Sequence, residues 1–337
     1  MSTVELSRPP TLAALYRRAA LRALTRRSTG SVPERTLVLR GVTVDRGRLA
    51  AYDRACGFPL ADPLPPTYPH VLAFPLAMEL MSAADFPFPV VGLVHLTNRI
   101  TVARPVLAGE TLDLAVHAEN LRPHDRGRQV DVVAVATVDG VQVWRGVSTY
   151  LRREAAGRGV ASREATSRDA MGGEAADRDA MGGEAAGRDA ASPAGGDRPG
   201  RPSAPPPDAL WQVPRIVGRD YAAVSGDRNP IHTSRVAARL FGFARPIAHG
   251  MWSKARCLAA LAGRLPDAYQ VEVGFKLPIL LPASVAFTAT PGAPAASGGW
   301  AFTLHDARSG KPHLTGTVTA TAPGPVSPAS PEHAAPA

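Results

Sequence analysis

The sequence has few cysteines, few aromatic residues and no long apolar run. Its 337 residues contain two cysteines, Cys56 and Cys257, and 6% aromatic residues. The cysteines lack the paired spacing of a zinc site or of a disulfide framework, and no apolar run reaches the roughly 18 to 20 residues that a membrane-spanning helix needs. These absences exclude a fibre, a disulfide-stapled domain and a transmembrane protein, and we expect a cytoplasmic protein.

Lysine is also scarce, although the chain is basic. Three of its 38 basic residues are lysines, and the net charge is +9. Residues 1–40 hold eight arginines and two glutamates, so they carry +6 of that charge. No nucleic-acid-binding motif accompanies these arginines, and a basic cluster alone indicates only an electrostatic contact. We therefore expect no nucleic-acid partner.

The basic cluster predicts an amphipathic helix within an N-terminal segment, residues 1–35. Thr11 is suited to cap this helix. Apolar residues follow it at helical spacing, namely Leu12, Leu15, Tyr16, Ala19, Ala23 and Leu24. Such a helix suits an acidic membrane surface, an acidic protein partner or a mitochondrial transit peptide. A solvated helix that packs its leucines on the rest of the protein is the simpler interpretation, and we favour it.

Two segments have too little apolar surface to fold. Residues 152–209 contain no Leu, Ile, Phe, Tyr or Trp, and they include a ten-residue tandem repeat seen at 168–176 and 178–186. Because almost nothing can be buried against the entropy of ordering such a chain, we expect a disordered, low-complexity linker. Residues 322–337 are rich in Pro and Ala and predict a disordered tail for the same reason.

The remaining chain falls into two blocks, 36–151 and 210–321, with the same order of patterns. Each block begins with a short apolar strand and a helix, continues through a loop broken by Gly and Pro, and then has one apolar helix followed by β-rich runs. The expected apolar helices are 72–84 and 249–265. The expected strands are 94–102, 111–120, 129–138 and 141–151 in the first block, and 270–276, 284–290, 300–306 and 313–321 in the second.

Short residue patterns also recur between the blocks. Tyr-x-x-x-Cys-Gly at 52–57 is echoed 169 residues later by Tyr-x-x-x-Ser-Gly at 221–226. Arg-Pro-Val-Leu at 104–107 is echoed 173 residues later by Leu-Pro-Ile-Leu at 277–280. One long helix wrapped by an antiparallel sheet, occurring twice, predicts an α+β fold.

The two blocks differ where the second reads Ser-Gly-Asp-Arg-Asn-Pro-Ile-His, at 225–232. Asp227 and His232 would face different sides of a regular helix, but the glycine and proline of this motif disfavour a helix here. A turn can therefore bring the carboxylate and the imidazole together for acid–base catalysis on one water or hydroxyl. The alternative is that Asp227 and Asn229 only form Asx turns, with His232 a polar residue whose hydrogen bonds are satisfied.

The second apolar helix opens near Gly250. Without a side chain, Gly250 leaves room for a ligand carbonyl to reach its N–H at the positive end of the helix, which would form an oxyanion site. Close packing of the helix start against a strand is the alternative. We expect a structural rather than a catalytic role for His249.

The motif at 225–232, with its continuation at 241–251, resembles the signature of the MaoC-like, (R)-specific enoyl-thioester hydratases of the hotdog fold, also called hydratase 2. The first block, with Tyr-Pro-His at 68–70 and Phe-Pro-Phe-Pro at 86–89, resembles the degenerate N-terminal hotdog of the two-hotdog subgroup. Within that subgroup it is most similar to the actinobacterial (3R)-hydroxyacyl-thioester dehydratases of fatty-acid elongation. Apart from the linker, the resemblance covers 36–321. It implies a double hotdog joined as a pseudo-dimer, with a non-catalytic first half and a catalytic second half.

The resemblance also implies residue roles. Asp227 and His232 would activate the water that adds to C3 of a trans-2-enoyl thioester. In reverse they would remove hydroxide and the C2 proton on the same face. The N–H of Gly250 would stabilise the enolate-like thioester oxygen, and Asn229 would support the loop. No metal or redox cofactor is implied, the substrate carrier would be coenzyme A or acyl carrier protein, and a homodimer is left open.

Two other functions stay open at this point, a hotdog acyl thioesterase and a non-catalytic acyl-thioester-binding subunit. If the first half lacks catalytic residues and joins the second edge to edge, it would supply sheet surface and an apolar tunnel for the acyl chain. Residues of the kind that would line such a tunnel are more often plain hydrophobic core, and we favour that interpretation; they are Phe74, Leu76, Met78 and Phe86.

Overall fold

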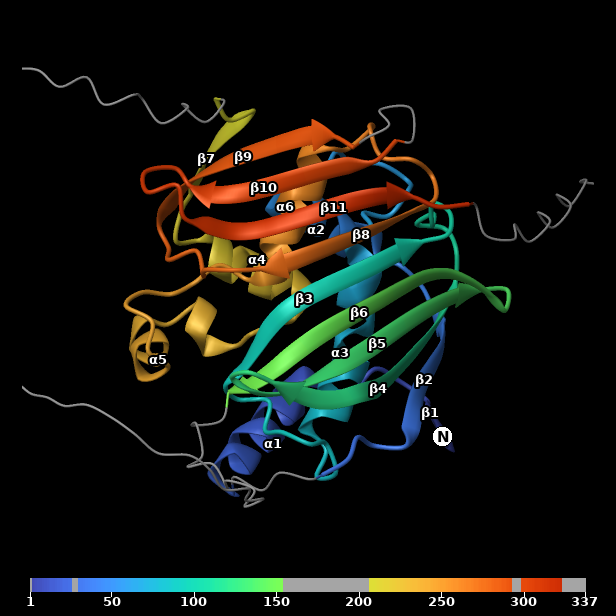
Figure 1. Cartoon of the computed structure of the whole chain (residues 1–337). Helices are drawn as coiled ribbons and strands as arrows, with labels where there is room; N and C mark the ends of the chain where they lie inside the picture. Colours follow the sequence, from blue (N-terminus) through green and yellow to red (C-terminus); the bar gives the residue numbers. More distant parts are fainter. Residues whose placement is uncertain (1, 26–29, 154–205, 293–297, 323–337) are drawn as a thin grey trace, which may run out of the picture. The chain divides into compact units, whose positions relative to one another are not determined.

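The structure, a computed structural model, describes residues 2–25, 30–153, 206–292 and 298–322 (Figure 1). Most of the predicted linker and nearly all of the predicted tail lie outside these residues, so both remain predictions. In the described part of the chain, no helix is long and apolar enough to cross a membrane.

The first half begins with a strand and a helix, as its pattern predicts. Helix α2 starts at Arg46 because the side chain of Asp45 accepts a hydrogen bond from the backbone N–H of Arg48 at 2.7 Å. The elements of this half are β2 (Arg35–Val42), α2 (Arg46–Cys56), α3 (Tyr68–Ser82), β3 (Leu93–Val102), β4 (Leu112–His124), β5 (Gly127–Val138) and β6 (Val141–Arg153).

The second half repeats this order and adds two short helical turns between its first and second long helices. Its elements are β7 (Ala209–Val213), α4 (Val217–Ser225), the 3-10 turn η1 (Pro230–His232), α5 (Arg235–Leu240), α6 (Gly250–Ala260), β8 (Tyr269–Phe275), β9 (Ala283–Pro291), β10 (Trp300–Asp306) and β11 (Pro312–Ala320). The predicted order of strands and helices in the two blocks is therefore confirmed.

The two apolar helices differ from their predicted bounds for local reasons. Helix α3 begins at Tyr68 rather than at 72, because Pro69 sits in its first turn, where a proline costs no intrahelical hydrogen bond. Helix α6 ends at Ala260 rather than at 265. The chain then turns, and Gly263 adopts a φ of +76°, which a helix does not allow.

The two halves share one sheet, whose strand order is β1-β2-β4-β5-β6-β3-β8-β11-β10-β9-β7, where β1 is Ser2–Leu6. Strands β3 and β8 meet at the junction and pair antiparallel, with Ile100 opposite Val271. Helices α2, α3, α4 and α6 lie on one face of this sheet (Figure 1). Two helix-and-sheet units joined edge to edge confirm the predicted double hotdog.

A buried lysine on a helix forms hydrogen bonds with both strands at the junction. Lys254, on α6, has a relative exposure of 0%. Its Nζ donates to the carbonyl O of Asn98 at 3.0 Å, to the Oδ1 of the same residue at 2.7 Å, and to the carbonyl O of Val271 at 3.2 Å. A side chain from the second half thus binds both central strands, and each ammonium hydrogen has an acceptor.

The duplicated Tyr-x-x-x-(Cys/Ser)-Gly pattern marks equivalent helix ends. Gly57 follows α2 with a φ of +81°, and Gly226 follows α4 with a φ of +80°. Both glycines close their helices in the left-handed conformation that a Cβ disfavours. The tyrosines of the two patterns, Tyr52 and Tyr221, face each other with ring centroids 6.0 Å apart. The internal duplication is therefore visible in the fold.

The four side chains suggested as a tunnel lining are all buried in the main hydrophobic cluster, Phe74, Leu76, Met78 and Phe86. They pack as hydrophobic core, in a cluster that includes residues of both halves.

The predicted N-terminal helix is present as α1 (Leu12–Thr25). Its apolar face is directed at the protein, since Leu15 and Ala19 are buried, whereas Leu21 on another face is exposed. This confirms the interpretation that the helix packs on the rest of the protein. Strand β1 precedes it and pairs parallel with β2, at the edge of the sheet.

Candidate active site

The loop between α4 and η1 carries the predicted motif. Gly226 ends α4, and the backbone N–H of Asp227 then donates to the Oγ of Ser225 at 3.1 Å. Asn229 caps η1, because its Oδ1 accepts from the N–H of Ile231 at 3.3 Å. The chain therefore turns twice within a few residues, and the two turns set the direction of the side chains at both ends of the motif.

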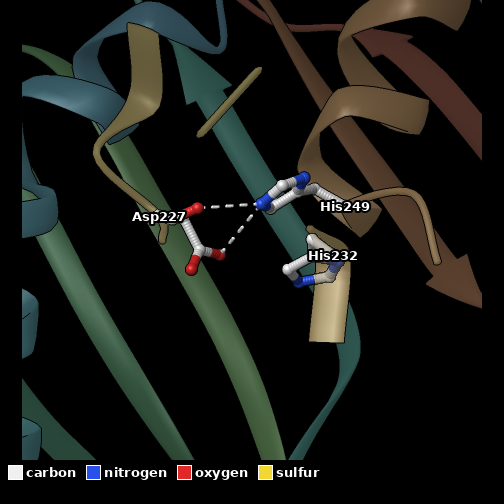
Figure 2. A group of neighbouring side chains, drawn as sticks. All are labelled: Asp227, His232 and His249. Carbon is white, nitrogen blue, oxygen red and sulfur yellow. Dashed lines mark hydrogen bonds and ion pairs between the residues drawn. The ribbon is translucent and has the colours of Figure 1, made fainter. Parts of the chain in front are cut away.

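This loop and the start of α6 bring Asp227, His232 and His249 together (Figure 2). One potential ligand atom from each of the three lies within 4.8 Å of the others. The Asx contact that was the alternative interpretation is also present, since the N–H of Asn229 donates to the Oδ1 of Asp227 at 3.2 Å. The turn and the convergence of the two functional groups thus occur together.

The protonation state of His232 follows from its hydrogen bond. Its Nδ1 lies 2.8 Å from the carbonyl O of Ile247, and a carbonyl can only accept, so Nδ1 carries the proton and the neutral ring leaves Nε2 as an acceptor. Burial lowers the pKa of His232 below its ordinary value of 6.5, although Asp227 and the bond to Ile247 oppose this. His232 is therefore a neutral proton acceptor at neutral pH.

His249, the N-cap residue of α6, braces the other two groups. Its Nε2 donates to the backbone carbonyl O of Asp227 at 2.9 Å, and its ring stacks on that of His232 with centroids 3.6 Å apart. Burial, together with the neighbouring imidazole, lowers the pKa of His249 to about 3. The ring is neutral and holds the position of the Asp227 backbone and of the His232 ring.

Asp227 is the ionised member of the group. Burial raises the pKa of its carboxyl, but the imidazoles of His249 and His232, where they are protonated, and two hydrogen bonds lower it by more, so the pKa lies below the ordinary 3.8. The two hydrogen-bond donors are the N–H of Asn229 and the hydroxyl of Tyr16, and both reach Oδ1. These donors act whatever the charge on the imidazoles.

Tyr16 is a site residue that the sequence analysis missed. It lies on α1, and its hydroxyl donates to the Oδ1 of Asp227 at 3.0 Å. The same hydroxyl oxygen accepts from the backbone N–H of Arg228 at 2.8 Å. No local pattern connects residues more than 200 positions apart. The one signal in the sequence is that Tyr16 shares the apolar face of α1 with Leu12 and Leu15.

Gly250 is the first residue of α6, and its N–H therefore belongs to the group of helix-opening donors without an intrahelical acceptor. A Cβ at this position would lie 3.1 Å from the Cε1 of Phe275, at the end of β8. Close packing, the alternative interpretation of this glycine, is thus part of the structure. A side chain at this position would therefore press against the ring of Phe275.

The first half also reaches this region. His95, on β3, pairs across the ladder with Tyr150, on β6, and the two rings stack with centroids 4.7 Å apart. The ring of His95 lies 4.8 Å from that of Phe275, the residue that packs on Gly250. Burial lowers the pKa of His95 to about 3, so it is neutral. Nothing in the sequence of β3 distinguishes His95 from other strand residues.

Asp227, His232 and His249 are also the group of described residues whose donor atoms could hold a metal ion. Two of their ring nitrogens already donate to carbonyls, the Nδ1 of His232 and the Nε2 of His249. A metal would therefore have to use the remaining nitrogens and the carboxylate. The sequence expectation that no metal is needed stays a prediction.

The sequence is similar to a known domain family and to a curated protein. Residues 213–290 match the family model for the MaoC like domain. Over 316 residues the chain is 35% identical to 3-hydroxyacyl-thioester dehydratase X of Mycobacterium tuberculosis, which covers 93% of this chain and 99% of that protein.

Solved structures agree with the sequence comparison. The crystal structure of HtdX from Mycobacterium tuberculosis is similar with a TM-score of 0.67 at 34% identity, covering 85% of this chain and 100% of that one. A MaoC-like dehydratase from Phytophthora capsici is similar with a TM-score of 0.60 at 19% identity, covering 86% of this chain and 96% of that one, which shows a shared fold.

Proposed function

The chain belongs to the MaoC-like dehydratase family, and on that premise we propose that it interconverts (3R)-3-hydroxyacyl thioesters and trans-2-enoyl thioesters. One observation carries the proposal: a carboxylate and a neutral imidazole with a free Nε2 converge within 4.8 Å in the second half. Both groups accept hydrogen bonds, and a pair of acceptors is what the activation of one water requires. The reaction is a hydro-lyase reaction.

In the hydration direction, Asp227 and His232 hold one water between them. Each accepts one of its hydrogens, which leaves a lone pair of the water oxygen free to face C3 of the enoyl group. His249 keeps this geometry by fixing the backbone of Asp227 and the plane of the His232 ring. Orientation of this kind removes much of the entropic barrier to the addition.

The proton balance of the step follows from the starting state. When the water oxygen bonds to C3, the π electrons of the enoyl group move towards the thioester oxygen, and one proton of the water passes to the acid–base pair. Because the pair starts without a proton, that proton is the one it can deliver to C2 as the enolate collapses. Delivery from the same pair puts the new C–H and C–O bonds on one face, and the dehydration direction runs through the same states in reverse.

The thioester oxygen needs stabilisation while it carries negative charge. Gly250 supports this role, since its N–H lies at the positive end of α6 and the residue has no side chain of its own. A preorganised donor aimed at a developing oxyanion contributes strongly to acyl-transfer and enolate chemistry. In this proposal Asn229 has no chemical step and shapes the loop through its cap on η1.

The substrate carrier in this proposal is coenzyme A or acyl carrier protein, and the enzyme acts in the cytoplasm. A reducing compartment agrees with the two cysteines, which are free and buried. No redox cofactor takes part, because the reaction adds and removes water without a change in electron count.

The test uses the purified full chain with trans-2-enoyl-CoA thioesters of increasing length. Enoyl absorbance, product configuration and free thiol are recorded in the same reactions. We expect loss of the enoyl absorbance, a (3R)-3-hydroxyacyl product and no thiol. Thiol release with the enoyl group intact would instead identify an acyl thioesterase, and binding without either reaction would identify a non-catalytic subunit.

A further inference from the structure

Helix α1 is fastened to the first half beside the candidate active site. Arg18 donates to the Oγ of Ser82 at 2.7 Å and forms an ion pair with Glu79 at 2.9 Å, both at the end of α3. Arg22 donates to the carbonyl O of Phe86 at 2.8 Å. The arginines that made this helix a candidate for an acidic partner therefore include two that bind within the same chain.

The start of the same helix touches the loop of the second half. A Cβ on Gly226 would lie 2.5 Å from the Cδ1 of Leu12, so the loop glycine provides the room that α1 occupies. Four residues further, one turn along the same face, Tyr16 meets Asp227 and Arg228. Helix α1 thus connects the first half to the loop that bears the predicted catalytic carboxylate.

The hydrogen bonds of Tyr16 have only one consistent direction. The backbone N–H of Arg228 can only donate, so the hydroxyl oxygen accepts from it at 2.8 Å and its single proton is directed at the Oδ1 of Asp227, 3.0 Å away. The other acceptor within reach, the carbonyl O of Gly226, is farther, at 3.4 Å. Burial and the charge of Asp227 raise the pKa of Tyr16, so the hydroxyl remains a donor.

These contacts divide the two oxygens of the Asp227 carboxylate. Oδ1 receives both Tyr16 and the N–H of Asn229, whereas Oδ2 lies on the side of His249, 3.9 Å from its Nε2. We propose that Tyr16 is a positioning residue for Asp227, orienting its carboxylate and stabilising its ionised form. This inference rests on the proposed function, in which Asp227 is catalytic. It assigns a supporting role to a helix that precedes both hotdog halves.

The test is the substitution Tyr16→Phe in the full chain, which removes the hydroxyl and keeps the ring. The loss of a hydrogen bond to a charged group lowers a rate that depends on it about tenfold. We therefore expect kcat/KM with crotonyl-CoA to fall about tenfold. The ionised carboxylate also loses a donor, its pKa rises, and the acid limb of the pH profile must move to higher pH. A purely structural role would not move that limb.

Tyr52→Phe is the matched control. Tyr52 donates to the Oγ1 of Thr67 at 2.8 Å, in the interior of the first half, and makes no contact with Asp227. We expect Tyr52→Phe to keep the wild-type pH profile even where its thermal stability falls by as much as that of Tyr16→Phe.

The outcomes separate this inference from the proposed function. A Tyr16→Phe enzyme with wild-type kcat/KM and an unmoved acid limb overturns the role of Tyr16, while an inactive Asp227→Asn enzyme in the same series keeps the proposed function. A fall in kcat/KM without movement of the limb also overturns the positioning role. Full activity of Asp227→Asn would instead remove the proposed function itself.

Discussion

Lys254→Met tests how the two halves are held together. The substitution keeps the length and most of the apolar stem of the side chain but removes its three hydrogen bonds, two to Asn98 and one to Val271. At about 1 kcal/mol for each bond the loss is about 3 kcal/mol. Relief from burying an ammonium group offsets part of this. We therefore expect the free energy of unfolding to fall by about 2 kcal/mol.

Equilibrium unfolding in urea measures this change, and the chain offers a matched control. Lys276 lies just beyond the end of β8 and is exposed, so Lys276→Met should leave the free energy of unfolding within about 0.5 kcal/mol of the wild type. A double-mutant cycle with Asn98→Leu should give a coupling energy of about 1 kcal/mol, because the two residues contact each other directly.

The opposite result, a Lys254→Met protein at least as stable as the wild type, would also have a physical cause. Replacing a buried charge by an apolar side chain can stabilise a protein when desolvation dominates. Burial does lower the pKa of Lys254 well below its ordinary value of 10.5. A Lys254→Met protein at least as stable as the wild type, with no coupling to Asn98, would refute the argument that these hydrogen bonds secure the junction.

Two further predictions concern the reaction. The pKa values of His232 and Asp227 both lie below their ordinary 6.5 and 3.8. We therefore expect kcat/KM to stay constant from about pH 8 down through 6.5 and to fall only in more acidic solution, where the interacting pair of Asp227 and His232 gains a proton; an acid limb at or above 6.5 would contradict this. In Gly250→Ala the new Cβ meets Phe275 at 3.1 Å and displaces the N–H, so we expect kcat/KM to fall about tenfold. Gly109→Ala, where a Cβ meets nothing within 4 Å, is the control and should keep wild-type activity; equal activity of both variants would argue against the oxyanion role.

The elements of the fold were largely predictable because their signals are local. The alternating residues at 129–138 became β5 (Gly127–Val138), and the recurring Tyr-x-x-x-(Cys/Ser)-Gly pattern became two equivalent helix ends. The bounds of α3 were less predictable. Its residues are apolar on nearly every face, so no periodic pattern marks where the helix starts.

The site was predictable only where its geometry depends on residues that are close together in the sequence. Asp227 and His232 are brought together by a turn whose glycine and proline stand between or beside them in the sequence. Tyr16 and His95 come from other elements, and only the docking of α1 and the pairing of β3 with β6 bring them near the motif. Contacts of this kind depend on tertiary packing, which the pattern of a single segment does not contain.

The two halves contribute different residues to the candidate site. The second half holds the loop with Asp227 and His232 and the helix that begins at Gly250. The first half has no acid or imidazole at the matching loop positions, but it supplies His95, which lies beside Phe275 and stacks on Tyr150. It also anchors α1, which carries Tyr16 to Asp227. The half without the motif therefore still shapes the surroundings of the site.

The central claim is that Asp227 and His232 carry out the hydration step, and the most direct test measures kcat for crotonyl-CoA hydration in Asp227→Asn and His232→Gln. General acid–base groups contribute roughly 10²- to 10⁴-fold, so each variant should lose at least about 100-fold in kcat while its thermal unfolding stays cooperative. Asp53→Asn, which changes a buried carboxyl in the first half, is the control and should keep wild-type kcat. Near-wild-type kcat in both Asp227→Asn and His232→Gln would contradict the account.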